Sequence, residues 1–286
     1  MFEHAKLGES VFLRNLQIHP IQASVDDGIT VTSIDEVLRG IQGEFRELDV
    51  PDINRISFYN HGDTPILMLD GEEIIGSLQN RIVADSAFVT AHSTSNIPVI
   101  CAEEGRWSEL GTFKTGYCSY PGLRAILSRH GKRKNGVQKR VWKEIERKLT
   151  VTKTLSTTSS MHDVYSNLDD EITRYVEDFR GLNHSTVGFI GVAGGGILGC
   201  DIFSNPRMYR LFEHKLVRSY ALDAIEHRKS SGSTANTMGF LQDISNSLEA
   251  KKFPQKIHHF TLKGQIFSGQ GVSHQNRIIH LSAFPK

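Results

Sequence analysis

The sequence predicts an α+β protein, in which antiparallel-rich β-sheets are flanked by several helices. Short apolar runs separated by turn formers fill the first part of the chain, whereas long amphipathic stretches appear after about Tyr120. Strands and helices come in blocks instead of alternating, which argues against a doubly wound parallel sheet. We therefore expect a β-rich half at residues 1–120 and a helix-rich half at 121–286, either as two intimately packed halves or as one single domain.

The first half predicts one short helix among β-strands. Ser33 followed by Glu36 has the form of a capping box before the apolar positions of a helix, and Gly43 is expected to close it. Strands are expected at 12–18, 56–59, 66–69, 81–83, 87–90 and 97–101. Turn formers at 60–63, 70–71 and 93–96 separate these runs, which indicates a meander of antiparallel strands.

The second half predicts helices, a glycine-rich hairpin and C-terminal strands. Helical spacing occurs at 137–149, 161–179, 208–227 and 234–251, and strand patterns at 187–192, 197–203, 257–262 and 278–281. The glycines at 194–196 separate two of these strands. A phosphate-binding loop would need a following Lys-Ser/Thr pair and a helix, so a tight hairpin is the favoured interpretation.

Composition excludes several classes of function. Lys plus Arg (33) nearly equals Asp plus Glu (32), so no overall field favours nucleic acid, and the basic stretch at 129–148 is better explained as a solvated helix face. The longest apolar runs are too short to span a bilayer, so no membrane partner is expected.

Cysteine usage and the first residues indicate a cytoplasmic protein. The three cysteines, Cys101, Cys118 and Cys200, form no CxxC pair and predict free thiols. Residues 1–6 lack the basic-then-apolar layout of a secretion signal. We see no HExxH or comparable metal-binding spacing.

Polar side chains gather around a predicted turn at 70–71. Glu72 would emerge there between apolar runs. Gln79 and Asn80 offer paired donors and acceptors suited to a base or ribose, and Arg81 offers a fork for phosphate or carboxylate. The alternative is a surface turn in which Glu72 forms a salt bridge with an arginine.

A second polar group follows the strand at 97–101. Alternation places Cys101 and Glu103 on one face, with Arg106 and Trp107 after a glycine turn. Cys101 is a candidate nucleophile or, since no histidine lies at a local activating spacing, a small buried thiol. Glu103 is a candidate general base or ion ligand, or it neutralises an arginine. Trp107 would stack on a base or be a buried indole.

Two further polar residues lie in strongly apolar surroundings in the second half. Asp201 follows the predicted hairpin and His280 lies in the last predicted strand. Each is either a partner that supports a site residue or a core polar group with its hydrogen bonds satisfied.

Two motifs together resemble a specific family. Gly-Glu at 71–72 with Gln-Asn-Arg at 79–81 is followed by Cys-x-Glu-x-Gly-Arg-Trp at 101–107. The chain resembles the ARG and Rhodanese-Phosphatase-superfamily-associated domain family, named for its genomic neighbours, with ARG standing for ADP-ribosylglycohydrolase. The resemblance extends from about residue 8 to 284. The resemblance implies that the polar positions of the family correspond in this chain to Glu72, Gln79, Asn80, Arg81, Cys101, Glu103, Arg106, Trp107, Asp201 and His280.

The resemblance implies work on a small nucleotide-like ligand related to ADP-ribose or NAD. In the leading hypothesis the protein binds and processes it by hydrolysis or transfer. Glu72 and Glu103 then share acid–base roles, with Cys101 as a further catalytic candidate, or the carboxylates hold a divalent cation. Arg81 and Arg106 hold the diphosphate. The alternatives are a non-catalytic nucleotide-signal binding protein and a protein-interaction subunit whose motif braces the fold.

Overall fold

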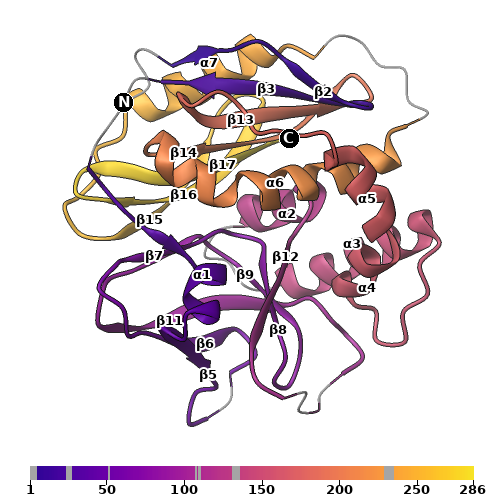
Figure 1. Ribbon diagram of the computed structural model, residues 1–286, viewed down its shortest axis with the longest axis vertical. Helices are drawn as coiled ribbons and strands as arrows, with labels where there is room; N and C mark the ends of the chain where they lie inside the picture. Colours follow the sequence, from indigo (N-terminus) through magenta and orange to yellow (C-terminus); the bar gives the residue numbers. More distant parts are fainter. Residues whose placement is uncertain are drawn as a thin grey trace. The chain divides into compact units, whose positions relative to one another are not determined.

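The α+β class is confirmed. The structure, a computed structural model, describes residues 5–23, 28–50, 52–106, 108, 111–130, 136–228 and 235–286. In these ranges it contains seven helices and three antiparallel-rich sheets (Figure 1). Of the helices described, not one combines the length and the apolar character needed to span a bilayer.

The chain divides into two compact units. Unit 1 comprises Met1–Ile29, Tyr120–Gly131 and Asp170–Lys286, and unit 2 comprises Thr30–Ser119 and Lys132–Asp169. Each unit is therefore assembled from segments that are separated in the sequence.

Unit 1 is built on an eight-stranded sheet with the order β1-β3-β13-β14-β17-β16-β15, and β2 pairs with β3 (Figure 1). All of these pairings are antiparallel. The strands are β1 (Lys6–Leu7), β2 (Val11–Leu13), β3 (Leu16–Gln22), β13 (Thr186–Ala193), β14 (Gly196–Phe203), β15 (His258–Lys263), β16 (Phe267–His274) and β17 (Arg277–Pro285).

Helices cover both faces of this sheet. The helices of unit 1 are α2 (Pro121–His130), α6 (Pro206–Glu226) and α7 (Thr237–Glu249), and α5 (Asp169–Val176) begins at the unit boundary. Helix α6 packs on β13 and β14, and α2 packs on β16 and β17 and contacts α6. Phe189 of β13 meets Tyr220 of α6, whereas the adjacent Ile190 joins the cluster of Phe240 in α7. Alternate residues of β13 therefore face opposite helices.

Unit 2 holds a six-stranded sheet, ordered β12-β8-β9-β11-β6-β5, and a three-stranded sheet, ordered β10-β7-β4. Its strands are β4 (Thr32–Ser33), β5 (Gly43–Arg46), β6 (Arg55–Asn60), β7 (Ile66–Met68), β8 (Glu72–Ile75), β9 (Arg81–Val83), β10 (Ala87–Val89), β11 (Ser93–Cys101) and β12 (Lys114–Cys118). Its helices are α1 (Ile34–Arg39), α3 (Val137–Thr152) and α4 (Met161–Asn167).

The register of β8, β9 and β11 decides where the polar side chains point. Arg81 pairs with Ile74 on one side and with Cys101 on the other. Glu73 pairs instead with Ile82. Because paired residues share a face and neighbours along a strand alternate, Arg81 and Glu73 lie on opposite faces of the sheet.

Several local predictions are confirmed. Ser33 and Glu36 form both hydrogen bonds of the capping box at the start of α1. The turn at 194–195 joins β13 to β14 as a hairpin, and both glycines have positive φ angles. The α3 and α6 helices lie where the spacing predicts them.

Other local predictions were wrong. Residues 12–18 form a hairpin and not one strand, because Arg14 adopts a left-handed conformation with φ 58° between β2 and β3. The stretch at 161–179 contains two short helices that meet at Leu168. Residues 93–96 belong to β11 and not to a turn, and α1 ends at Gly40, before the expected Gly43.

Candidate functional site

The two sequence motifs interlock in unit 2. The turn between β8 and β9 uses left-handed backbone at Gly76 (φ 108°) and Ser77 (φ 47°), which turns the chain toward Gln79 and Asn80. Gln79 Nε2 donates to the Glu103 carbonyl at 3.1 Å. The backbone N–H of Asn80 donates to Glu103 Oε2 at 3.1 Å, and the backbone carbonyl of Asn80 accepts from the backbone N–H of Ala102. The amides predicted to orient a ribose or base thus join the two motifs.

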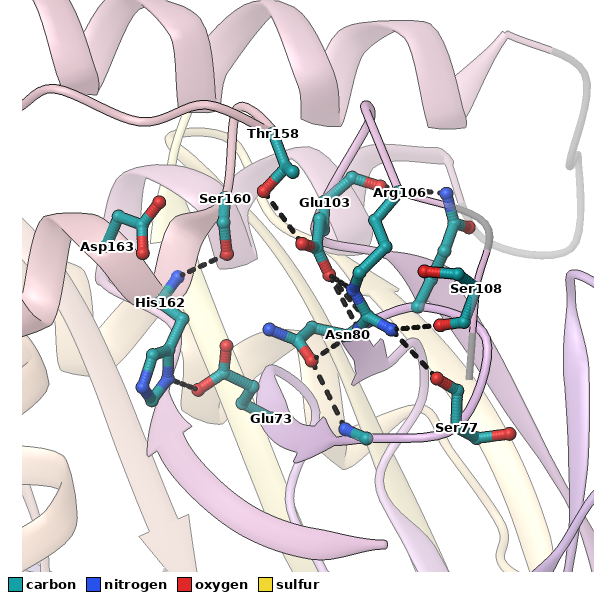
Figure 2. A network of polar contacts seen from close by, with 12 residues as sticks. Glu73, Ser77, Asn80, Glu103, Arg106, Ser108, Thr158, Ser160, His162 and Asp163 are labelled. Carbon is teal, nitrogen blue, oxygen red and sulfur yellow. Dashed lines mark hydrogen bonds and ion pairs between the residues drawn. The ribbon is translucent and has the colours of Figure 1, made fainter. Parts of the chain in front are cut away.

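Arg106 completes this junction, which we call the motif clasp and which comprises Gln79, Asn80, Glu103 and Arg106. Figure 2 shows Asn80, Glu103 and Arg106 of the clasp. Arg106 Nε donates to Glu103 Oε2 at 2.9 Å and its Nη2 to Asn80 Oδ1 at 3.0 Å. Its Nη1 donates to the carbonyls of Ser77 and Ser108. The guanidinium predicted to hold a diphosphate is therefore bound on every nitrogen by the protein's own acceptors.

Glu103 is equally well bound. Thr158 Oγ1 donates to Glu103 Oε1 at 2.7 Å, while the other oxygen accepts from Arg106 and Asn80. Burial alone would raise the pKa of Glu103, but hydrogen bonds from Arg106, Thr158 and Asn80 outweigh it and lower the pKa. Glu103 is thus an ionised acceptor that holds the clasp together.

A carboxylate–histidine pair lies beside the clasp in the same unit (Figure 2). Glu73 Oε2 lies 3.0 Å from Nδ1 of His162 at the start of α4 and accepts from the Tyr117 amide N–H. The Glu73 side chain is fully buried, whereas His162 is 31% exposed. The hydrogen bond to Glu73 raises the pKa of His162, partial burial opposes this, and the charges of Glu73, Asp163 and Glu103 add to the rise.

His162 keeps one ring nitrogen available. Among the described residues, its Nε2 has no hydrogen-bond partner. Glu73 Oε1 is also buried without a partner in the described part of the chain. A histidine held through Nδ1 by a carboxylate, with Nε2 free to accept a proton, has the geometry of a general base.

The surroundings of this pair are shaped for it. A Cβ at residue 116 would lie 2.1 Å from Glu73 Oε2, so only glycine at that position leaves room for the carboxylate. Tyr117 stacks on Tyr165 with ring centroids 4.4 Å apart and also contacts the His162 ring at 5.2 Å. These aromatic rings limit the orientations open to the imidazole.

Arg81 lies on the opposite face of the sheet from Glu73. Its Nη1 bonds Glu47 at 3.0 Å, and the guanidinium lies beside the thiol of Cys101. Burial raises the pKa of Cys101, and Arg81 offsets only part of the rise. The backbone of Cys101 is held on both sides by the amide of Gln138 in α3. These observations describe a neutral buried thiol.

The remaining candidates of the first half are placed as follows. Glu72 is buried, and its Oε2 accepts from the Leu69 amide N–H within the same turn. Glu72 pairs with Cys118 of β12 across the sheet, on the face opposite to Glu73. Trp107 lies outside the described residues.

Asp201 and His280 meet in unit 1, together with Arg124 of α2 and Tyr220 of α6. Arg124 donates to both oxygens of Asp201 at 2.9 and 2.6 Å, and Tyr220 OH donates at 2.8 Å. His280 Nε2 lies 3.1 Å from Asp201 Oδ1. Burial would raise the pKa of Asp201, but Arg124 and His280 hold it well below its usual range. Side chains in this buried network are wholly inaccessible.

No metal centre emerges from these side chains. Within the part of the chain that the structure describes, no group of three or more His, Cys, Asp or Glu side chains is arranged to hold an ion. Glu72 accepts from the Leu69 amide N–H, whereas Glu103 accepts from Asn80 and Arg106 of the clasp.

Sequence reasoning missed Glu73, His162 and Thr158. Glu72 and Glu73 are neighbours on β8, and only the strand register shows which of them faces α4. His162 lies 89 residues from Glu73, so no local spacing connects them. Gly116 marks the position that must lack a side chain to leave room for Glu73, but this can be recognised only when the pairing of β12 with β8 is known.

The fold is an α+β fold, and in unit 2 it places an internally bonded clasp next to a carboxylate–histidine pair. The chain belongs to the ARG and Rhodanese-Phosphatase-superfamily-associated Protein domain family, whose family model matches residues 4–284. Comparison with curated proteins and with solved structures gave no match.

Proposed function

We propose that the protein binds and hydrolyses a phosphorylated, nucleotide-like ligand related to ADP-ribose or NAD, with His162 as the general base. The observation that carries the proposal is the 3.0 Å contact between buried Glu73 and partly exposed His162. The ligand class is inferred from the family's name, ARG and Rhodanese-Phosphatase-superfamily-associated, in which we take ARG to stand for ADP-ribosylglycohydrolase.

In this mechanism a water molecule bound at Nε2 of His162 is the nucleophile. Its oxygen forms a bond to the electrophilic carbon or phosphorus of the ligand while a proton passes to Nε2. The bond to the leaving group breaks, and the leaving group takes the electron pair and receives a proton from the imidazolium or from solvent. Glu73 keeps the ring oriented and stabilises its positive charge, as an acid partner of histidine does in other hydrolases.

In this proposal the catalytic roles belong to His162 and Glu73, and not to Glu72, Glu103 or Cys101, which were the catalytic candidates from the sequence. Glu103 and Arg106 neutralise each other within the clasp, so they support the site by holding the β8–β9 turn. Glu73 replaces Glu72 as the carboxylate of the mechanism. The hydrogen bond to Glu73 raises the pKa of His162, which makes the imidazole a stronger base.

A binding protein without chemistry is the alternative, and the stacked pair Tyr117–Tyr165 beside His162 favours it as a platform for a planar ring. It would retain the ligand intact, and His162 would serve as a hydrogen-bonding group. Mass spectrometry distinguishes hydrolysis of the ligand from binding without chemistry.

The test is mass spectrometry on the full chain mixed with NAD, ADP-ribose and cyclic ADP-ribose, with and without magnesium or manganese. We expect a product mass that the wild type forms and that His162→Gln forms about 10²–10⁴-fold more slowly. His92→Gln is the matched control, because His92 bonds Asp63 at 2.7 Å on an exposed surface. A nucleotide retained intact would show binding without catalysis, and equal turnover by His162→Gln would rule out the general base.

A further inference from the structure

Arg81 is a fully buried guanidinium whose hydrogen bonds are incomplete. Its Nη1 is bonded to Glu47, and the Cys101 thiol is a weak hydrogen-bond partner of the guanidinium, but Nε and Nη2 have no oxygen or nitrogen partner among the described residues. The side chain is 0% exposed at the end of β9, next to the apolar cluster that contains Ile74 and Val83. Leaving buried donors of a charged group unpaired costs about 1–3 kcal/mol or more, so such an arrangement points to an absent acceptor.

The two terminal nitrogens of Arg81, Nη1 and Nη2, make a fork that can bind a carboxylate or phosphate through two oxygens. Glu47 bonds only Nη1 of this fork, and Nη2 has no partner within the described residues. The Cys101 thiol beside Arg81 stays neutral because burial raises its pKa, so it supplies no compensating charge.

Glu47 reaches Arg81 from a segment that borders solvent. It follows β5 directly, its side chain is 22% exposed, and it also accepts a hydrogen bond from Ser77 Oγ at 2.7 Å. A single carboxylate therefore spans the hydroxyl of Ser77 and the guanidinium, in the position that an oxyanion of a ligand would take.

We propose that Arg81 and Ser77 form a binding site for a small oxyanion, the phosphate or carboxylate group of a ligand, and that Glu47 covers this site as an internal competitor. The anion takes the place of the Glu47 carboxylate at Arg81 Nη1 and Ser77 Oγ, and the unpaired Nη2 of Arg81 gives it a second donor from the same guanidinium. Because Arg81 and Glu73 lie on opposite faces of the sheet, this site is separate from the His162 pair and does not depend on the proposed hydrolysis.

The test measures thermal unfolding of the full chain against increasing inorganic phosphate or acetate, with chloride at matched ionic strength as the baseline. In Glu47→Gln, Arg81 loses its counter-charge, so we expect a lower Tm without phosphate and a Tm that recovers as phosphate is added. The midpoint of the recovery should lie at least about tenfold below any wild-type midpoint, because the competitor is gone.

Glu44→Gln is the matched control, since Glu44 lies on β5 and pairs with exposed Arg46 instead of a buried arginine. It should respond to phosphate like the wild type. Arg81→Gln should lose the response, and the contrast between Glu47→Gln and Glu44→Gln decides the matter if Arg81→Gln fails to fold. A phosphate response no larger in Glu47→Gln than in Glu44→Gln would overturn the site, whatever the outcome of the hydrolysis assay.

Discussion

The buried carboxylates of the two units have different surroundings. In unit 1, Asp201 is bonded by Arg124, Tyr220 and His280, and these side chains are closed to solvent. In unit 2, Glu73 is equally buried, but its partner His162 is partly exposed and keeps a free ring nitrogen within the described residues. A closed network can only hold the fold, whereas an open one can also exchange a proton.

Unit 2 also contains an ion pair that is closed to solvent, as the Asp201 network is in unit 1. Glu103 and Arg106 are 6% and 8% exposed, and both are saturated by neighbouring groups. The clasp thus resembles the Asp201 network in being closed, and the chemistry we propose lies at Glu73, one residue along β8 from Glu72.

The largest effect is expected for Asp201→Asn. Removing the charge leaves Arg124 without its bidentate partner, and breaking a buried ion pair costs about 3–5 kcal/mol. Urea unfolding measures the free energy directly, with Asp178→Asn as a control because the Asp178 side chain is 92% exposed. A loss similar to that of the control would show that the Asp201 network contributes little to stability.

Glu103→Gln should have the next largest effect, about 2–3 kcal/mol, since it weakens the bonds from Arg106 and Thr158 without creating a cavity. Its exposed neighbour gives the control Glu104→Gln, for which the unfolding free energy should change by less than about 0.5 kcal/mol. The same urea experiment compares the two variants. Equal stability of both would contradict the clasp as a structural element.

Gly116→Ala should displace the Glu73 carboxylate, because the added Cβ would lie 2.1 Å from Glu73 Oε2. The bond that raises the pKa of His162 is then lost, so the pKa should fall toward the ordinary value of about 6.5. NMR titration of the His162 ring measures it, and His92 provides an internal reference. An unchanged His162 pKa would mean that Glu73 does not hold the ring as described.

The smallest effect is the pH dependence of stability through His162. Folding raises the pKa of His162, so protonated His162 stabilises the folded protein. This contribution to the free energy of unfolding is fully present below the unfolded pKa of about 6.5 and is lost as the pH rises through the folded pKa. The difference in unfolding free energy between wild type and His162→Gln should shrink by up to about 1 kcal/mol between pH 5.5 and 8.5. A difference that grows with pH would contradict a charged His162 paired with Glu73.

The sequence predicted features that depend on neighbours in the chain. The Ser33–Glu36 capping box and the glycine turn at 194–195 are defined by residues within one turn of each other. Arg14 could not be predicted to break a strand, since an arginine gives no signal for left-handed backbone. The Arg124–Asp201 and Glu73–His162 contacts span 77 and 89 residues, so they depend on strand order and register.

The most direct test compares the rate of product formation per folded molecule in His162→Gln and Glu103→Gln. We expect His162→Gln to keep its stability within about 1 kcal/mol and to lose turnover by about 10²-fold or more, because the substitution removes only the base. Glu103→Gln should lose stability but retain turnover within a few-fold. The reverse pattern, with turnover retained in His162→Gln and lost in folded Glu103→Gln, would place the chemistry in the motif clasp and contradict the account.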